Sequence, residues 1–302
     1  MLIKLSKNNP LFQYALVIIV SLLLWGKTFM ETGFSHSGSY LSWGISLLCT
    51  IGFCLLLTRH RISRSPGLHA VVLLCLVATT LHAGYFPLMW VYLLFLLSFY
   101  YLLDIYGKEK PYPALFNAIF FWSTGTLFFP ELIFTLPCFW IILLTYAVGN
   151  WHVWAASLLA MGTPFLLTGA YDLLWHENIL QQTFSRIMIF GPPSCTAERM
   201  LGLALLCFCI VLAFISIFSM QKYLQGLEIT ERRKVASIIV MFLYLTVFMA
   251  AGGGNINHNL FPLFMPVAFL CTNAILYMNN GLLKEILFAL ILTAGIGITW
   301  FG

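Results

Sequence analysis

The residues that could carry chemistry in this chain lie near the ends of its long apolar runs. When the runs are placed as alternating membrane spans, the carboxylates Glu31, Glu131 and Asp172 and the imidazoles His82 and His258 fall on one predicted outer face. Carboxylates can act as general bases, and a histidine can pair with a phosphate. These five residues are therefore the candidate catalytic groups, and their types favour a lipid substrate that bears a phosphate or a carbohydrate. Ordinary interfacial polar residues remain the alternative, because the sequence does not show that they converge.

A glycine-rich turn adds a candidate anion site on the same predicted face. Successive glycine N–H groups can curl into an anion-binding nest, and the start of the following helix adds its positive end. A lipid phosphate bound there has these candidate ligands: Gly252, Gly253, Gly254, Asn255, His258, Arg186 and Arg199. Three glycines and two asparagines are equally typical of a tight turn with no ligand, so both interpretations stay open.

The composition decides which elements must position these residues. Of the 302 residues, 61% are hydrophobic and 8% are charged, whereas charged residues normally approach a quarter of a soluble domain. The chain must therefore use the lipid bilayer as its solvent. Backbone groups in hydrocarbon must bond internally, and long continuous apolar runs favour helices over a barrel. We expect an all-α, polytopic helical membrane protein.

Eleven spans are predicted, with boundaries near 10–29, 40–58, 68–84, 86–104, 114–129, 131–147, 152–174, 199–220, 235–251, 259–279 and 282–301. A cytoplasmic N-terminus puts twelve of the fifteen Lys and Arg residues on the inner side, as the positive-inside rule requires. Outside fall Lys27, Arg186 and Arg199. The cations therefore report orientation, and the sequence predicts no nucleic-acid partner.

Two of the predicted spans, 68–84 and 114–129, are shorter than the roughly 20 residues that cross a bilayer without tilt. Either could instead be a re-entrant segment or a short buried helix. If one short segment and its partner span do not cross the bilayer, nine spans remain. No linker or soluble domain interrupts the chain, so residues 1–302 are predicted to form a single integral membrane domain. Lys4 and Lys7 precede a first apolar run that is too long for a signal peptide core, which favours a retained span.

The segment 175–198 is the one long loop on the predicted outer face. It places Leu180, Phe184, Ile187 and Met188 on one helical face, which predicts a helix that lies in the membrane interface. A short connector and a lid over an outward-facing cavity are both compatible with it. Pro137 and the segment 162–164 interrupt predicted spans, and such positions favour kinks that serve helix packing. If the protein is a transporter, the same interruptions could form a substrate site at the depth of the membrane midplane.

Cysteine usage gives no sign of a metal or cofactor. Seven of the eight cysteines lie in apolar runs, and Cys195 alone is in a loop. This spacing shows neither a disulfide framework nor a CxxC metal pair. No cofactor and no metal site are predicted.

Short motifs in the middle of the chain are Phe116-Asn117-Ala118, Leu127-Phe128-Phe129-Pro130, the Trp151 and Trp154 pair, and Gly162-Thr163-Pro164. The C-terminal part contains Glu231-Arg232-Arg233-Lys234, the His258 to Pro266 turn and span, and Lys284-Glu285-Ile286-Leu287. With these motifs the chain resembles a family of uncharacterised polytopic inner-membrane proteins of Bacteroidetes-type bacteria, catalogued as a domain of unknown function. The resemblance implies the fold and the compartment, and it supplies no catalytic residue. His152-Val153 departs from the Arg-Glu expected there, so a cationic role at that point does not carry over.

The function expected from these patterns is cell-envelope assembly at the periplasmic face of the bacterial inner membrane. Many spans, a glycine-rich outer turn and outward-facing carboxylates are compatible with binding or processing of a lipid-linked glycan, as in glycosyltransferases and polymerases. The first outer loop is short and has one acidic residue, Glu31, which argues against that class. A membrane transporter, or a non-catalytic scaffold subunit with membrane protein partners, remains the alternative. Whether the protein is an enzyme stays open.

Overall fold

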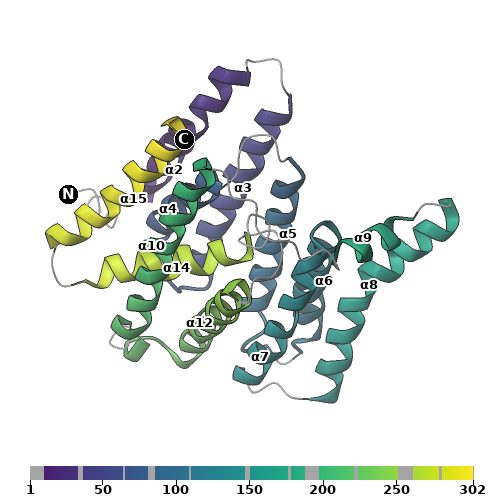
Figure 1. Cartoon of the computed structure of the whole chain (residues 1–302). Helices are drawn as coiled ribbons and strands as arrows, with labels where there is room; N and C mark the ends of the chain where they lie inside the picture. Colours follow the sequence, from purple (N-terminus) through teal and green to yellow (C-terminus); the bar gives the residue numbers. More distant parts are fainter. Residues whose placement is uncertain are drawn as a thin grey trace. The chain divides into compact units, whose positions relative to one another are not determined.

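A computed structural model of the chain describes residues 10–32, 37–63, 65–80, 86–108, 110–146, 150–175, 178–187, 197–220, 224–250, 261–278 and 281–301 (Figure 1). This part of the chain is all-α. Its helices are α2 (Pro10–Thr32), α3 (Ser37–Arg59), α4 (Pro66–Thr80), α5 (Phe86–Leu103), α6 (Tyr112–Phe128), the 3-10 helix η1 (Pro130–Thr135), α7 (Pro137–Thr145), α8 (Trp151–Trp175), α9 (Ile179–Ile187), α10 (Ala197–Ser219), α12 (Ile229–Ala250), α14 (Phe261–Tyr277) and α15 (Gly281–Phe301).

Every predicted span coincides with helix, and one of them is broken. The range 131–147 contains the end of η1 and all of α7, which begins at Pro137. A proline has no N–H to donate and its ring clashes with the carbonyl four residues earlier, so a new helix starts there more readily than an old one continues. With nine residues, α7 is roughly 13 Å long and is too short to cross a bilayer alone.

Three described helices are long and apolar enough to cross a membrane, namely Tyr40–Arg59, Trp151–Trp175 and Gly281–Trp300, and six shorter apolar helices accompany them. These segments indicate a multi-pass membrane protein. The 25 residues of α8 span roughly 37 Å, somewhat more than a hydrocarbon core of about 30 Å. Trp151 and Trp175 at its two ends are 70% and 62% exposed, which suits indole rings at the two membrane interfaces.

The helices group into two compact units whose segments alternate along the chain. Unit 1 comprises 1–89, 195–228 and 264–302, and unit 2 comprises 90–194 and 229–263. This division does not test the prediction of one membrane domain over residues 1–302, which stays a prediction. Each unit is described separately below.

Two short helices with most of their length in unit 1 are buried over nearly all of that length. In α4 every residue from Gly67 to Ala78 is buried, and α2, α3, α10 and α15 all pack against it. In α14 every residue from Phe264 to Ile275 is buried. Because neighbouring helices cover α4, it needs no match to the bilayer thickness. Of the two interpretations of the 68–84 run, the structure favours a short buried helix.

A close approach of α2 to α4 requires glycine at the start of α4. The side-chain Oε1 of Gln13 accepts a hydrogen bond from the Gly67 N–H at 2.9 Å. A Cβ atom on Gly67 would lie 2.4 Å from the Gln13 Cβ, well inside van der Waals contact. The buried amide of Gln13 therefore satisfies one of the free N–H groups that every helix start presents.

In unit 2 the long helix α8 packs along α6 and continues through Pro164. The Ser123 hydroxyl on α6 donates to the Met161 carbonyl at 2.8 Å, and Thr163 donates to the Leu159 carbonyl at 2.6 Å. Hydroxyl groups thus bond the carbonyls of Leu159 and Met161, on either side of the Ala160 carbonyl that Pro164 leaves without a helix N–H. Nearby, the indole N–H of Trp122 donates to the Thr135 hydroxyl at 2.8 Å and fixes the end of η1.

Candidate functional site

The predicted site residues are described to different extents. His82, Gly252, Gly253, Gly254, Asn255 and His258 lie outside the described residues, as do residues 188–196. The positions of Glu31, Glu131, Arg186 and Arg199 are described on the backbones of α2, η1, α9 and α10 respectively. Asp172 is the candidate whose side chain the structure describes. Convergence of the whole set is therefore not tested, and one part of it in unit 2 can be examined.

Asp172, near the C-terminal end of α8, is bound to the start of α9. One carboxylate oxygen accepts a hydrogen bond from the Leu180 N–H at 2.8 Å, and the other accepts from the Ile179 N–H at 3.2 Å. A carboxylate at a helix N-terminus satisfies free N–H groups and faces the positive end of the helix dipole. The structure thus gives Asp172 a structural role, and a reaction that used it as a base would first have to release α9.

The predicted interface helix exists as α9, and its apolar face docks on α8. The Leu180 side chain lies 3.0 Å from the position that a Cβ atom on Gly169 would occupy. The rings of Phe165 and Phe184 stack with centroids 6.0 Å apart. Leu180 and Phe184 thus share one face, as predicted, but in the structure that face packs against α8, whereas the sequence predicts that it faces the membrane interface. A side chain at Gly169 would push α9 away from α8.

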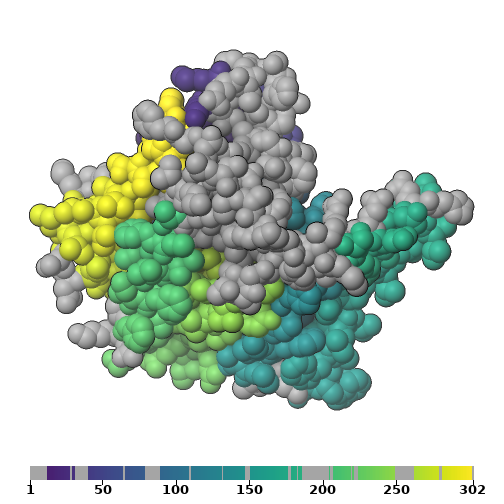
Figure 2. All heavy atoms as spheres, in the orientation of Figure 1, coloured from purple at the N-terminus to yellow at the C-terminus, as the bar shows by residue number. Residues whose placement is uncertain are grey.

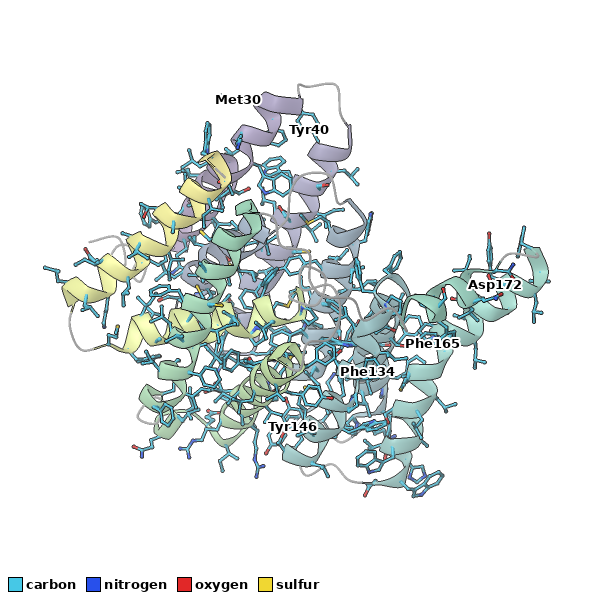
Figure 3. All side chains as sticks on the ribbon, viewed as in Figure 1. Met30, Tyr40, Phe134, Tyr146, Phe165 and Asp172 are labelled. Atoms are coloured by element: carbon cyan, nitrogen blue, oxygen red, sulfur yellow. The ribbon has the colours of Figure 1, made fainter. Side chains whose placement is uncertain are left out.

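The contacts of η1 complete one end of unit 2. Both α8 and η1 contact α9, so the helices that carry Glu131, Asp172 and Arg186 meet at one place. Tyr244 of α12 reaches the same place, where its hydroxyl donates to the Phe134 carbonyl at 2.8 Å. Figure 3 shows Phe165 between Phe134 and Asp172, with Tyr146 farther away. We call the assembly of η1, α9 and the C-terminal end of α8 the α9 end of unit 2.

The other end of unit 2 gathers segments that the sequence predicts on the inner side. An Arg233 guanidinium N–H donates to the Thr145 carbonyl at the end of α7, where a cation suits the negative end of the helix dipole. The Tyr146 hydroxyl donates to the Ser237 hydroxyl at 2.8 Å. The rings of Tyr106 and Tyr146 lie 5.3 Å apart, which adds the loop after α5. The loops near residues 106, 146 and 233, which the sequence predicts on the inner side, therefore lie together at this cation-rich end of unit 2.

Unit 1 also gathers its predicted inner segments at one end. The Gln13 contact joins the first part of α2 to the start of α4, which directly follows the loop that carries Arg61. Lys284 at the start of α15 donates to the Leu276 carbonyl at the end of α14, at 2.8 Å. At the opposite end, the Trp300 N–H donates to the Leu23 carbonyl at 2.8 Å. These contacts place the start of α2 beside the start of α4 and the end of α15 beside the second half of α2, and the predicted alternation of the spans stays a prediction.

A buried polar pair joins the two enclosed helices of unit 1. His69 on α4 is 0% exposed and Asn273 on α14 is 1% exposed. The His69 Nε2 lies 3.3 Å from the Asn273 Oδ1, and the His69 Nδ1 lies 2.9 Å from the Ser65 carbonyl oxygen. The imidazole also stacks on Phe269, with ring centroids 5.4 Å apart. An ionisable side chain enclosed among apolar helices is a functional candidate by default, because it is expensive to bury.

The sequence analysis missed this pair. His69 lies one turn after the loop that carries the inner cations, so a side chain that reaches the interface was the simpler interpretation. Asn273 is the amide in an otherwise apolar run, and the two residues are 204 positions apart. A search for every histidine and amide inside an apolar run would have found both residues, and the structure was needed to pair them.

No protein-family model, curated protein or solved structure matches the chain.

Proposed function

We propose that this chain is a multi-pass protein of the bacterial inner membrane, with a cytoplasmic N-terminus and related to the uncharacterised family that it resembles. It binds or processes a lipid-linked glycan at the periplasmic face, in cell-envelope assembly. The cation-rich ends of both units face the cytoplasm, and the α9 end of unit 2 faces the periplasm.

The observation that carries this proposal is the meeting of η1, α8 and α9 at one end of unit 2, separate from the end where Arg233 bonds Thr145. Ile179 and Phe184 of α9 are 37% and 47% exposed, and Leu173 and Leu174 of α8 are 81% and 72% exposed. Such a mixture of apolar side chains and charges suits the boundary between acyl chains and headgroups. In Figure 2 the C-terminal end of α8 stands out from the remaining helices of unit 2. A polyprenyl chain contacts the leucines, and its phosphate lies near Arg186.

The direct test is binding of a polyprenyl diphosphate-linked sugar to the purified protein in lipid nanodiscs, detected by native mass spectrometry. We expect a one-to-one complex that Asp172→Ala weakens severalfold, because α9 loses its anchor. Thr163→Val is the matched control, since the Thr163 hydroxyl bonds the Leu159 carbonyl of its own helix. Equal binding by the wild-type protein and Asp172→Ala would remove the α9 end from the proposal, and no binding by either would refute it.

A cellular test does not depend on the choice of lipid. Deletion of the gene, followed by comparison of surface glycans and lipid-linked precursors, should show an accumulated precursor and a reduced surface product. Restoration by the wild-type gene is the control. An unchanged profile would contradict the proposed role in envelope assembly.

The buried pair His69 and Asn273 favours a second candidate function, transport across the membrane. Polar and ionisable side chains enclosed among spanning helices commonly mark ion pathways and proton relays in transporters. The Pro164 break contributes less to this alternative, because α8 continues through it and Ser123 bonds the neighbouring carbonyl. Uptake assays on the deletion strain with radiolabelled solutes distinguish transport from glycan assembly, because the precursor profile then stays normal.

A further inference from the structure

The two nitrogens of the His69 ring both face oxygen atoms. Nδ1 lies 2.9 Å from the Ser65 carbonyl oxygen and 3.2 Å from the Ser63 hydroxyl, and Nε2 lies 3.3 Å from the Asn273 Oδ1. A carbonyl oxygen accepts hydrogen bonds and cannot donate them. The arrangement therefore satisfies a ring that carries a hydrogen on each nitrogen, which is the protonated form.

A neutral ring leaves one of these contacts unfavourable. With its hydrogen on Nε2, the ring donates to Asn273 and can accept from the Ser63 hydroxyl, but Nδ1 then turns a lone pair to the Ser65 carbonyl oxygen at 2.9 Å. That closer contact favours the hydrogen on Nδ1, and Nε2 then presents a lone pair to the Asn273 oxygen. Rotation of the Asn273 amide by half a turn removes this repulsion, because the Nδ2 group then donates to Nε2. The two amide orientations thus correspond to two protonation states of one ring.

The amide atom on the far side of Asn273 has no hydrogen-bond partner. Its Nδ2 is buried and unbonded, and the Ser65 hydroxyl is also buried and unbonded. Unpaired buried polar atoms cost free energy and are rare in proteins. When the amide rotates, this unpaired position changes from an N–H donor to a carbonyl acceptor.

We propose that His69 and Asn273 form a proton-binding site in the core of unit 1, in which uptake of a proton at the His69 Nε2 rotates the Asn273 amide. The proton comes from water on the side of the loop 60–65, where the half-buried Ser63 hydroxyl touches the ring. The ring gains one positive charge, and no covalent bond other than N–H forms or breaks. This site serves the transport alternative and is independent of glycan binding at the α9 end.

The ring has no charged partner among the described residues. Titratable groups with described side chains on the helices around the ring are Tyr14 and Lys27 on α2, Tyr40, Cys49, Cys54 and Arg59 on α3, Cys207 and Cys209 on α10, Cys271 and Tyr277 on α14, and Lys284 and Glu285 on α15. None of these described groups has a charge interaction with His69. Among the described residues, only neutral oxygens contact the ring nitrogens, and no described carboxylate is paired with the ring.

Nitrogen-15 NMR of histidine-labelled protein in nanodiscs tests the site directly. His69→Gln identifies the His69 signals by their loss. We expect one neutral tautomer with hydrogen on Nδ1 at high pH, and a spectrum with two protonated nitrogens at low pH, within the range where the protein stays folded. A ring that keeps a single neutral tautomer throughout that range would overturn the proposal.

Substitution of Asn273 tests whether the pair acts as a unit. Asn273→Asp puts a negative charge beside the ring and should increase its proton affinity at least about tenfold, and Asn273→Leu removes the partner and should lower that affinity. The exposed His152 belongs to unit 2, so its signal should not respond to either change and serves as the internal control. Equal titration of His69 in the wild-type protein and in both variants would refute the role of Asn273. If one variant fails to fold, the other variant decides.

Discussion

Replacement of Asp172 by alanine should release α9 from α8. Both carboxylate oxygens bond N–H groups in the first turn of α9, at 2.8 and 3.2 Å. A helix of nine residues is too short to persist without tertiary support. Its position therefore depends on this anchor and on the contacts of Leu180 and Phe184 with α8.

The expected loss in the stability of α9 docking follows from the two hydrogen bonds and the negative charge of the Asp172 carboxylate. Removal of a capping side chain typically costs about 1 kcal/mol, and a carboxylate at a helix N-terminus adds about 0.3 to 1 kcal/mol. A total near 1.5 kcal/mol raises the equilibrium constant for opening of α9 roughly tenfold. Asp172→Asn keeps one acceptor oxygen and loses the charge, so it should produce a distinctly smaller effect.

Hydrogen–deuterium exchange in nanodiscs measures this opening. A peptide that covers 179–187 should exchange about ten times faster in Asp172→Ala than in the wild-type protein. A peptide from the first half of α8, which lies far from Asp172, should exchange at the same rate in both. Unchanged exchange of the α9 peptide in Asp172→Ala would refute the anchoring role and remove the structural basis of the α9 end.

Three further substitutions test the packing of the helices, with thermal unfolding in detergent as the measurement. Gly67→Ala should lower the free energy of unfolding by about 1 to 3 kcal/mol, because the new Cβ would lie 2.4 Å from the Cβ of Gln13. Gly44→Ala is the control and should leave the stability nearly unchanged, because no atom lies within 4 Å of its new Cβ. Ser123→Ala should lower the free energy of unfolding by about 1 kcal/mol, because it removes the hydrogen bond to the Met161 carbonyl of α8. An unchanged midpoint of thermal unfolding would show that this hydrogen bond does not contribute to stability. Arg61→Gly should raise the free energy of unfolding by up to about 1 kcal/mol, because Arg61 has φ 53°, a left-handed conformation that glycine adopts without strain. A lower stability of this variant would contradict the presence of backbone strain at Arg61.

Helix positions were largely predictable from the sequence because hydrophobic length and continuity decide them in a membrane protein. The exception is the range 131–147, where Pro137 starts a new helix instead of bending an existing one. A proline inside an apolar run is compatible with both outcomes. The neighbours decide between them, and here the Trp122 bond to Thr135 holds the preceding turn in place.

The polar contacts were much less predictable. Asp172 bonds N–H groups seven and eight residues later, across a turn whose shape the sequence does not specify. His69 pairs with a residue 204 positions away, and only tertiary structure reveals which of two apolar runs meet. Local periodicity therefore identifies helices and their faces, whereas the identity of buried hydrogen-bond partners depends on the packing of distant segments.

The central claim is a multi-pass membrane protein whose cation-rich loops share one side, and labelling with a membrane-impermeant maleimide tests it most directly. The background protein carries Cys195→Ser and Cys207→Ser. Three separate variants then each introduce one cysteine at an exposed position: Arg61→Cys, Ile229→Cys and Leu173→Cys. We predict that Leu173→Cys reacts in intact spheroplasts and that Arg61→Cys and Ile229→Cys react only after the membrane is permeabilised. Reaction of Arg61→Cys and Ile229→Cys from opposite sides would contradict the account.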